Sequence, residues 1–92
     1  MKAVWNGVVI AESDDVVLLE GEHWFPETAL KREFTSFSNH RSSDWRGQAQ
    51  HLSLFAKGEL LADAVCFYPE PKSGAESIRG RVAFGRGVRV ED

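Results

Sequence analysis

Residues 43–50 read Ser-Asp-Trp-Arg-Gly-Gln-Ala-Gln, and they mark the point where a polar stretch gives way to the longest strand-like run of the chain. From Gln48 to Ala56 the side chains alternate between two faces, which is the period of a β-strand. Lys57-Gly58-Glu59 then favours a hairpin turn, and residues 60–68 are rich in β-forming side chains. We therefore expect two long paired strands at the centre of the fold.

Shorter strands are predicted on either side of this pair. Asn6-Gly7 is well suited to a type I′ turn, and its apolar neighbours predict a tight β-hairpin near the start of the chain. Residues 16–20 predict a short apolar strand. Residues 78–84 alternate apolar positions with arginines, which predicts a strand with one packed and one cationic face. A last strand is predicted over residues 88–90.

Two segments between these strands predict other structures. Residues 25–34 begin with Phe-Pro-Glu and continue with good helix formers, and Leu30 and Phe34 are four positions apart. This pattern predicts a helix of about two turns that packs on the sheet. Residues 35–46 contain five hydroxyl side chains and no periodicity, which predicts a long loop. The fold class that follows is all-β with one short helix.

Length and composition limit what this protein can be. Its 92 residues make one domain, residues 1–92, with near-average proportions of charged and apolar residues, so we expect a folded chain rather than disorder. The single Cys66 excludes an internal disulfide and a cysteine-based zinc site. No apolar run is long enough to span a bilayer, and the amino terminus lacks the order of a secretion signal. We therefore expect a cytoplasmic protein with no membrane association.

Several classes of function lack their sequence signatures. The chain has no phosphate-binding loop, no dinucleotide fingerprint and no nucleophile elbow. His23, His40 and His51 are too widely spaced for the usual metal-ligand patterns, so we expect neither a metal nor a cofactor. The net charge of −3 disfavours a nucleic-acid partner, because such binding depends on phosphate contacts.

Trp45 and Arg46 are the strongest candidates for a binding site. The indole offers a stacking surface and the guanidinium offers a two-point donor, a combination that suits a small anionic or planar ligand. In the structural alternative, Trp45 closes the core and Arg46 pairs with a surface acid. We expect a ligand-binding pocket lined by aromatic and basic side chains: Trp24, Trp45, Arg46, His51 and Tyr68.

Two other functions stay open on the sequence. His51 lies between small residues on its strand face, where it has room to act as the general base of a small enzyme, or simply to bond within the sheet. Arg79 and Arg81 offer a surface for a protein-interaction or scaffold domain, or they protect an edge strand. We expect the chain to act as a monomer or a homodimer.

Six segments, in order, resemble the bacterial family called domain of unknown function 427. They are the Asn6-Gly7 hairpin, Trp24-Phe25-Pro26, Trp45-Arg46-Gly47-Gln48-Ala49, Asp63-Ala64, Tyr68-Pro69-Glu70-Pro71 and Gly80 to Phe84. The resemblance covers essentially the whole chain. It implies coiled, tent-like antiparallel sheets that form a small open barrel, similar in outline to methionine sulfoxide reductases of the B type. It implies no established activity.

The departures from the family pattern bear on mechanism. Family members commonly have a cysteine where this chain has Ser43, and an aromatic residue where it has His51. A mechanism that uses the thiol is therefore excluded here, whereas anion recognition through Arg46 is retained. A nucleotidyltransferase label is sometimes attached to the family, but this chain lacks the paired acids beside a Gly-Ser loop that such chemistry needs.

Overall fold

The computed structural model describes all residues, 1–92, and contains strands, turns and three single-turn 3₁₀-helices but no α-helix. The strands are β1 (Lys2–Trp5), β2 (Val8–Glu12), β3 (Val17–Leu19), β4 (Glu22–Pro26), β5 (Thr35–Asp44), β6 (Gly47–Ala56), β7 (Glu59–Phe67), β8 (Arg81–Phe84) and β9 (Arg89–Glu91). The 3₁₀-helices are η1 (Glu27–Ala29), η2 (Arg32–Phe34) and η3 (Glu76–Ile78). The predicted all-β class is confirmed.

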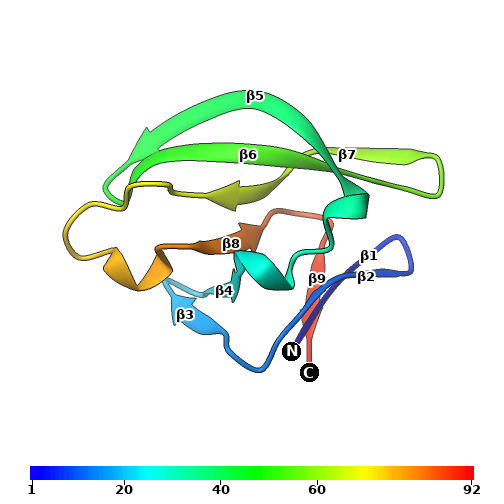
Figure 1. Ribbon diagram of the computed structural model, residues 1–92, viewed down its shortest axis with the longest axis horizontal. Coiled ribbons are helices and arrows are strands. Elements are labelled where there is room, and N and C mark those ends of the chain that lie inside the picture. Colours follow the sequence, from blue (N-terminus) through cyan, green and yellow to red (C-terminus); the bar gives the residue numbers. More distant parts are fainter.

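The strands form two antiparallel sheets (Figure 1). In the smaller sheet β1 lies between β2 and β9, and in the larger sheet the order is β3-β4-β8-β7-β6-β5. Figure 1 shows β5, β6 and β7 arching along one side, with the smaller sheet and both termini at the opposite side. Because β3 and β5 are unpaired edges, the larger sheet does not close, and the arrangement is open as predicted.

The hairpin predicted at Asn6-Gly7 is confirmed and joins β1 to β2. Asn6 has a φ of 52° and Gly7 a φ of 72°, as a type I′ turn requires. The Asn6 side chain also donates from Nδ2 to the Ala56 carbonyl oxygen at 3.1 Å. This bond ties the first hairpin to the end of β6.

The two long paired strands are confirmed as β6 and β7. Their pairing shifts at Ser53, where β7 contains additional residues opposite a single position of β6. Asp63 lies in this bulge with a φ of 56°, and its N–H donates to Ser53 Oγ at 3.0 Å. The register places His51 directly opposite Cys66.

The loop predicted over residues 35–46 was wrong, because β5 occupies most of that segment. β5 pairs with β6 from Thr35 to Asp44, with an irregularity between Phe37 and Arg41. Most side chains of β5 are exposed, so neither face shows the apolar alternation by which a strand is recognised. Backbone pairing with β6 makes this segment a strand, and that pairing leaves no periodic signal in the sequence.

The helix predicted over residues 25–34 was also wrong, since only η1 and η2 form there. The Glu27 N–H donates to the Gly80 carbonyl oxygen and the Lys31 N–H to the Ile10 carbonyl oxygen. These long-range bonds replace the helical ladder. Leu30 is buried and bridges to β2, so the apolar spacing reflects contact with the sheet without a helix. The structure has no helix long and apolar enough to cross a membrane.

The interior divides into two groups of buried side chains. The first core lies between the two sheets and consists of Ala3, Ile10, Ala11, Phe25, Leu30, Leu54, Ala64, Val65 and Val82. The second core lies toward the end formed by β3, β4 and η3, and it consists of Trp24, Ala49, Tyr68, Ala75, Ile78 and Ala83. β6 contributes to both, with Leu54 in the first and Ala49 in the second.

The register of β6 predicts that alanine substitutions at two neighbouring positions differ in their effect on stability. Leu54 is fully buried in the first core, whereas the adjacent Phe55 is half-exposed. Leu54→Ala should lower the free energy of unfolding by about 2–5 kcal/mol, because it leaves a cavity. Phe55→Ala should lower it by less than about 1 kcal/mol. Urea denaturation of both variants measures the difference, and equal losses would contradict this register.

Candidate functional site

The turn between β5 and β6 contacts the β3–β4 hairpin through two side-chain hydrogen bonds. The Trp45 Nε1–H donates to Glu20 Oε1 at 2.9 Å, and Arg46 Nη1 donates to Glu22 Oε1 at 2.8 Å. These pairs are 25 and 24 positions apart in the sequence. They therefore hold together two hairpins that are not neighbours in the larger sheet.

Arg46 is largely enclosed, with 17% of its side chain exposed. Asp44 Oδ2 accepts from Arg46 Nη2 at 2.7 Å and from Nε at 3.2 Å. The guanidinium carbon lies 4.9 Å from the centre of the Tyr68 ring and 5.8 Å from that of the Trp24 ring, within cation–π range. Together with Glu22, these contacts surround the cation with two carboxylates and two aromatic rings of the protein itself.

The turn residues make this arrangement locally. Asp44 Oδ1 accepts the backbone N–H of Arg46 at 2.8 Å, the side-chain-to-backbone bond that favours aspartate at the start of a turn. Gly47 follows with a φ of 128°, a conformation that side-chain-bearing residues rarely adopt. Tyr68 then reaches across from the end of β7 and donates its hydroxyl to Asp44 Oδ2 at 2.8 Å. One carboxylate thus joins the turn, the cation and the phenol.

These contacts fix the charges of the cluster. The hydrogen bonds from Arg46 lower the pKa of Asp44 from 3.8 to about 2. The Asp44 carboxylate in turn raises the pKa of Arg46 above its ordinary value. Burial, followed by the hydrogen bond to Asp44, raises the pKa of Tyr68. At neutral pH, Asp44 and Arg46 are therefore an ion pair and Tyr68 is a neutral donor, so none of the three is placed to act as a base.

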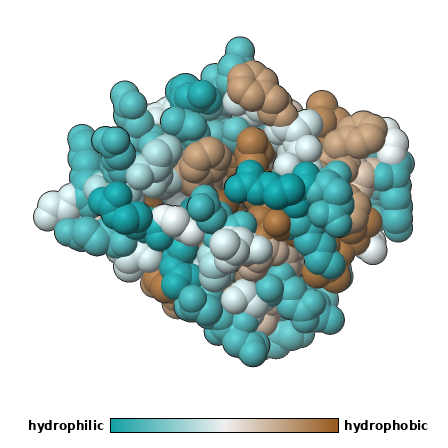
Figure 2. All heavy atoms as spheres, in the orientation of Figure 1, coloured by the Kyte–Doolittle hydropathy of each residue, from teal (hydrophilic) through white to brown (hydrophobic).

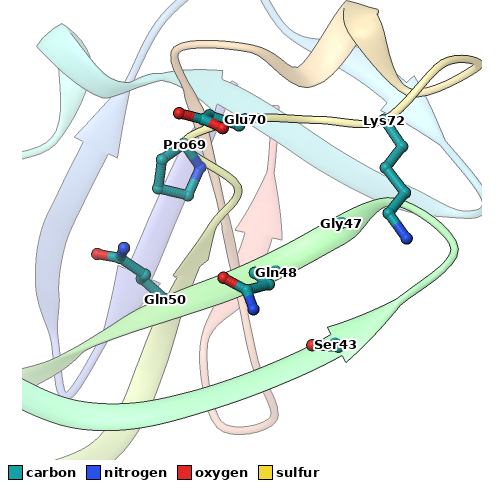
Figure 3. Close-up of a pocket in the computed structure, with 7 residues that line it drawn as sticks. All are labelled: Ser43, Gly47, Gln48, Gln50, Pro69, Glu70 and Lys72. Atoms are coloured by element: carbon teal, nitrogen blue, oxygen red, sulfur yellow. The ribbon is translucent and has the colours of Figure 1, made fainter.

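A hollow of about 650 Å³ lies beside this cluster, between the end of the β5–β6 hairpin and residues 69–72 (Figure 3). Every lining residue is polar, a glycine or a proline: Ser43, Gly47, Gln48, Gln50, Pro69, Glu70 and Lys72. Figure 3 shows Ser43 on β5, the two glutamines on β6, and Glu70 and Lys72 on the segment that faces them. The hollow therefore offers hydrogen-bonding groups from three segments of the chain.

The hollow shares a wall with the Arg46 cluster. The Lys72 N–H donates to the Arg46 carbonyl oxygen at 2.9 Å, which holds residues 69–72 against the turn. A Cβ on Gly47 would lie 3.0 Å from the Glu70 carbonyl oxygen, so only glycine allows this approach. The Arg46 side chain thus bonds within the cluster, and its backbone carbonyl oxygen bonds to the segment that forms the wall of the hollow.

Four of the five predicted site residues gather at this end of the molecule. Trp24 and Tyr68 are buried with ring centres 5.9 Å apart, and both contact Arg46. Trp45 is half-exposed on the adjoining turn. None of the four lines the hollow. Trp24 and Tyr68 pack in the second core, while Trp45 and Arg46 bond to acidic side chains of the same chain.

His51, the fifth predicted residue, has different neighbours. Its ring centre lies 4.6 Å from that of His40, and its Nδ1 is 3.3 Å from the His40 carbonyl oxygen. No carboxylate is hydrogen-bonded to it. Cys66, opposite on β7, is partly buried, and this burial raises the pKa of its thiol to about 11. The thiol is therefore protonated at neutral pH, as expected for a small buried side chain rather than a nucleophile.

The cationic face predicted from Arg79 and Arg81 is not a regular strand face. The strand predicted over residues 78–84 was wrong in its first part, because Ile78 belongs to η3 and β8 begins at Arg81. Arg79 is exposed, but Arg81 is 17% exposed and donates from Nη2 to Asp15 Oδ1 at 2.9 Å. Its Nη1 also donates to the Asp15 carbonyl oxygen. Arg81 therefore ties β8 to the segment before β3.

The side chains that line the hollow were not predicted from the sequence as site residues. Gln48 and Gln50 share their strand face with Leu52 and Leu54, so the sequence did not distinguish them as site residues. Glu70 lies between two prolines, a pattern that predicts only the end of a strand. The sequence does contain one signal of the site: the two glutamines closely follow the glycine of the turn. The sequence does not show the long-range contact that brings residues 69–72 over β6.

A family model matches residues 1–92, the full length described by the structure. The chain belongs to the family described as a domain of unknown function, DUF427. This confirms the resemblance inferred from the six segments. A comparison with curated proteins finds no significant match. Membership of DUF427 therefore assigns no activity, and the function has to be argued from the site itself.

Asp44→Asn should reveal the Arg46 ion pair through its pH dependence. Because the folded-state pKa of Asp44 is about 2, against an ordinary 3.8, its stabilisation is present above pH 3.8 and disappears as the pH falls toward 2. The stability difference between wild type and Asp44→Asn should therefore be large at neutral pH and shrink over that interval. Urea denaturation across this pH range measures it. The control is Asp14→Asn, at an exposed position with no ion pair; identical profiles would contradict the assignment.

Gly47→Ala should damage the wall of the hollow. The new Cβ would meet the Glu70 backbone, and the φ of 128° is unfavourable for alanine. Gly58→Ala is the matched control, since Gly58 has a φ of 77° and a Cβ placed there would have no neighbour within 4 Å. The control should lose about 1–2 kcal/mol and Gly47→Ala at least about 1 kcal/mol more. Only Gly47→Ala should shift the amide resonances of Glu70 and Lys72; equal effects would count against this close approach.

Proposed function

We propose that this DUF427 domain binds a small polar molecule in the hollow between the β5–β6 hairpin and residues 69–72. The lining supports the proposal, because it offers five polar or charged side chains beside one glycine and one proline. Ligand sites are typically concave and largely preformed, and this hollow has one wall fixed by the Arg46–Lys72 backbone bond. A ligand that fits it must form hydrogen bonds rather than bury apolar surface.

The aromatic and basic residues first expected to contact the ligand support the hollow from behind in this proposal. An anion that approached Arg46 would have to displace Asp44 or Glu22, both bonded to the guanidinium at 2.8 Å or less. Displacing a carboxylate leaves it without its partner, which is costly when the group is partly enclosed. Arg46, Trp24 and Tyr68 then hold the hairpin in place while neighbouring side chains contact the ligand.

A protein-interaction module is the second candidate, and its support comes from apolar rather than basic residues. Phe55 and Leu60 are cross-strand partners at the far end of β6 and β7, and they are 50% and 61% exposed. Figure 2 shows apolar side chains gathered on the right of this face, over the β6–β7 hairpin. Arg81 gives this candidate less support because it is paired with Asp15. An enzyme based on His51 has less support still, because no carboxylate orients the ring.

The ligand-binding proposal is tested by titrating the ¹⁵N-labelled domain with a set of polar metabolites. Binding should shift the amide resonances of Gly47, Gln48 and Gln50. Gln48→Ala should weaken that binding by about tenfold, the effect of losing one good hydrogen bond. Asn39→Ala is the control, because it removes an exposed amide from β5 outside the hollow. Shifts confined to other surfaces, or absent for every compound, would refute the proposal.

A further inference from the structure

Resting on the proposed function, we infer that the ligand is a small zwitterion of the amino-acid or short-peptide class. Its carboxylate would pair with Lys72 and its ammonium group with Glu70, while the polar groups between them bond to Gln48 and Gln50. Three features of the hollow support this inference: its charges, the rigidity of the segment that bears them, and the unused hydrogen-bonding groups of β6.

The hollow contains one cation and one anion, and both lack a partner. The four ion pairs of the protein involve Arg46, Arg81 and Arg89 as cations. Neither Lys72 nor Glu70 takes part in any of them, and neither side chain is hydrogen-bonded within the protein. By contrast, the charge of Arg46 is paired with carboxylates of the same chain. The two free charges at the hollow are therefore of opposite sign and available to a ligand.

The backbone that bears these charges is restrained. Prolines at positions 69 and 71 fix φ on either side of Glu70, and Pro71 is buried. The Lys72 N–H is held by the Arg46 carbonyl oxygen, and the Lys72 carbonyl oxygen accepts from the Ala75 N–H at 2.9 Å. Two positions along a chain span at most about 7 Å, so the charged side chains start close together. Figure 3 shows them extending toward different ends of the hollow.

The floor between the charges is made of amides. Gln48 and Gln50 are two positions apart on β6 and therefore project from the same face. Ser43 lies directly opposite Gln48 across the β5–β6 pair. None of these three side chains is hydrogen-bonded within the protein, and each amide has two donor hydrogens and a carbonyl acceptor. A ligand with donors and acceptors between its two charges would use this floor.

The opposite charges of Lys72 and Glu70 favour a zwitterion over the other simple classes of ligand. An anion alone would pair with Lys72 but would lie beside Glu70, and like charges at such a distance repel. A cation alone meets the reverse problem. A neutral sugar would leave both charges unpaired after displacing their water, which is unfavourable. Only a molecule with both charges satisfies Lys72 and Glu70 together.

The test is an NMR titration with glycine, 4-aminobutanoate and glycylglycine, which differ in the separation of their charges. N-Acetylglycine and glycinamide each lack one charge, while glucose and inorganic phosphate represent the other classes. At least one zwitterion should bind about tenfold or more tightly than its single-charge analogues, the effect of one charged hydrogen bond. Lys72→Gln and Glu70→Gln should each remove that advantage. Lys57→Gln and Glu59→Gln, which make the same charge changes at the exposed β6–β7 turn, should retain it.

The outcomes separate this inference from the function on which it rests. Lys72→Gln should bind a zwitterion and its carboxamide equally, because the partner of the carboxylate is gone. Binding of glucose or phosphate in the hollow without binding of any zwitterion would overturn the inference and leave the proposed function standing. Equal effects of the Lys72 and Lys57 variants would also overturn it. Failure of every compound to shift the hollow would overturn both.

Discussion

Arg46 is a permanent cation that the fold keeps largely out of water, and much of the structure depends on compensating it. Moving such a charge from water costs several kcal/mol unless close partners replace its hydration. Asp44 supplies one partner from within the same turn, and Glu22 supplies another from the β3–β4 hairpin. Trp24 and Tyr68 contact the guanidinium and also belong to the second core. A single charge therefore fixes two hairpins and one core relative to one another.

The parts of the fold that the sequence predicts well are those whose signal is local. Asn6-Gly7 determines a turn by its own backbone preferences, and β6 alternates in burial at each of its ends, where Ala49 and Leu54 are buried in different cores. The predictions that were wrong concern segments whose structure is determined by contacts with residues distant in the sequence. Residues 35–44 are a strand only because they pair with β6. Leu30 has the spacing of a helical residue, yet the backbone around it bonds to Ile10 and Gly80 instead of to itself.

The same distinction applies to the candidate site. The residue types at Trp45 and Arg46 were recognisable, because a guanidinium beside aromatic rings is uncommon and chemically specific. Their partners were not, because Glu20 and Glu22 come from a hairpin that is remote in the sequence. The choice between a free and an internally paired arginine depends entirely on such partners. Sequence patterns could therefore identify residues that gather at one end of the molecule but not the side chains that face solvent there.

The shape of the hollow depends on backbone atoms, whereas the groups that it offers to a ligand belong to side chains. Its shape depends on backbone contacts: the Lys72 N–H bonds to the Arg46 carbonyl oxygen, and Gly47 permits the approach of residues 69–72. Its hydrogen-bonding groups belong to side chains such as Ser43, which lines the hollow from β5. Because the bonds of this backbone frame do not involve the Ser43 side chain, a substitution there changes the groups that face the hollow and leaves the frame in place. The shape of the hollow and the groups that it presents can therefore change independently of each other.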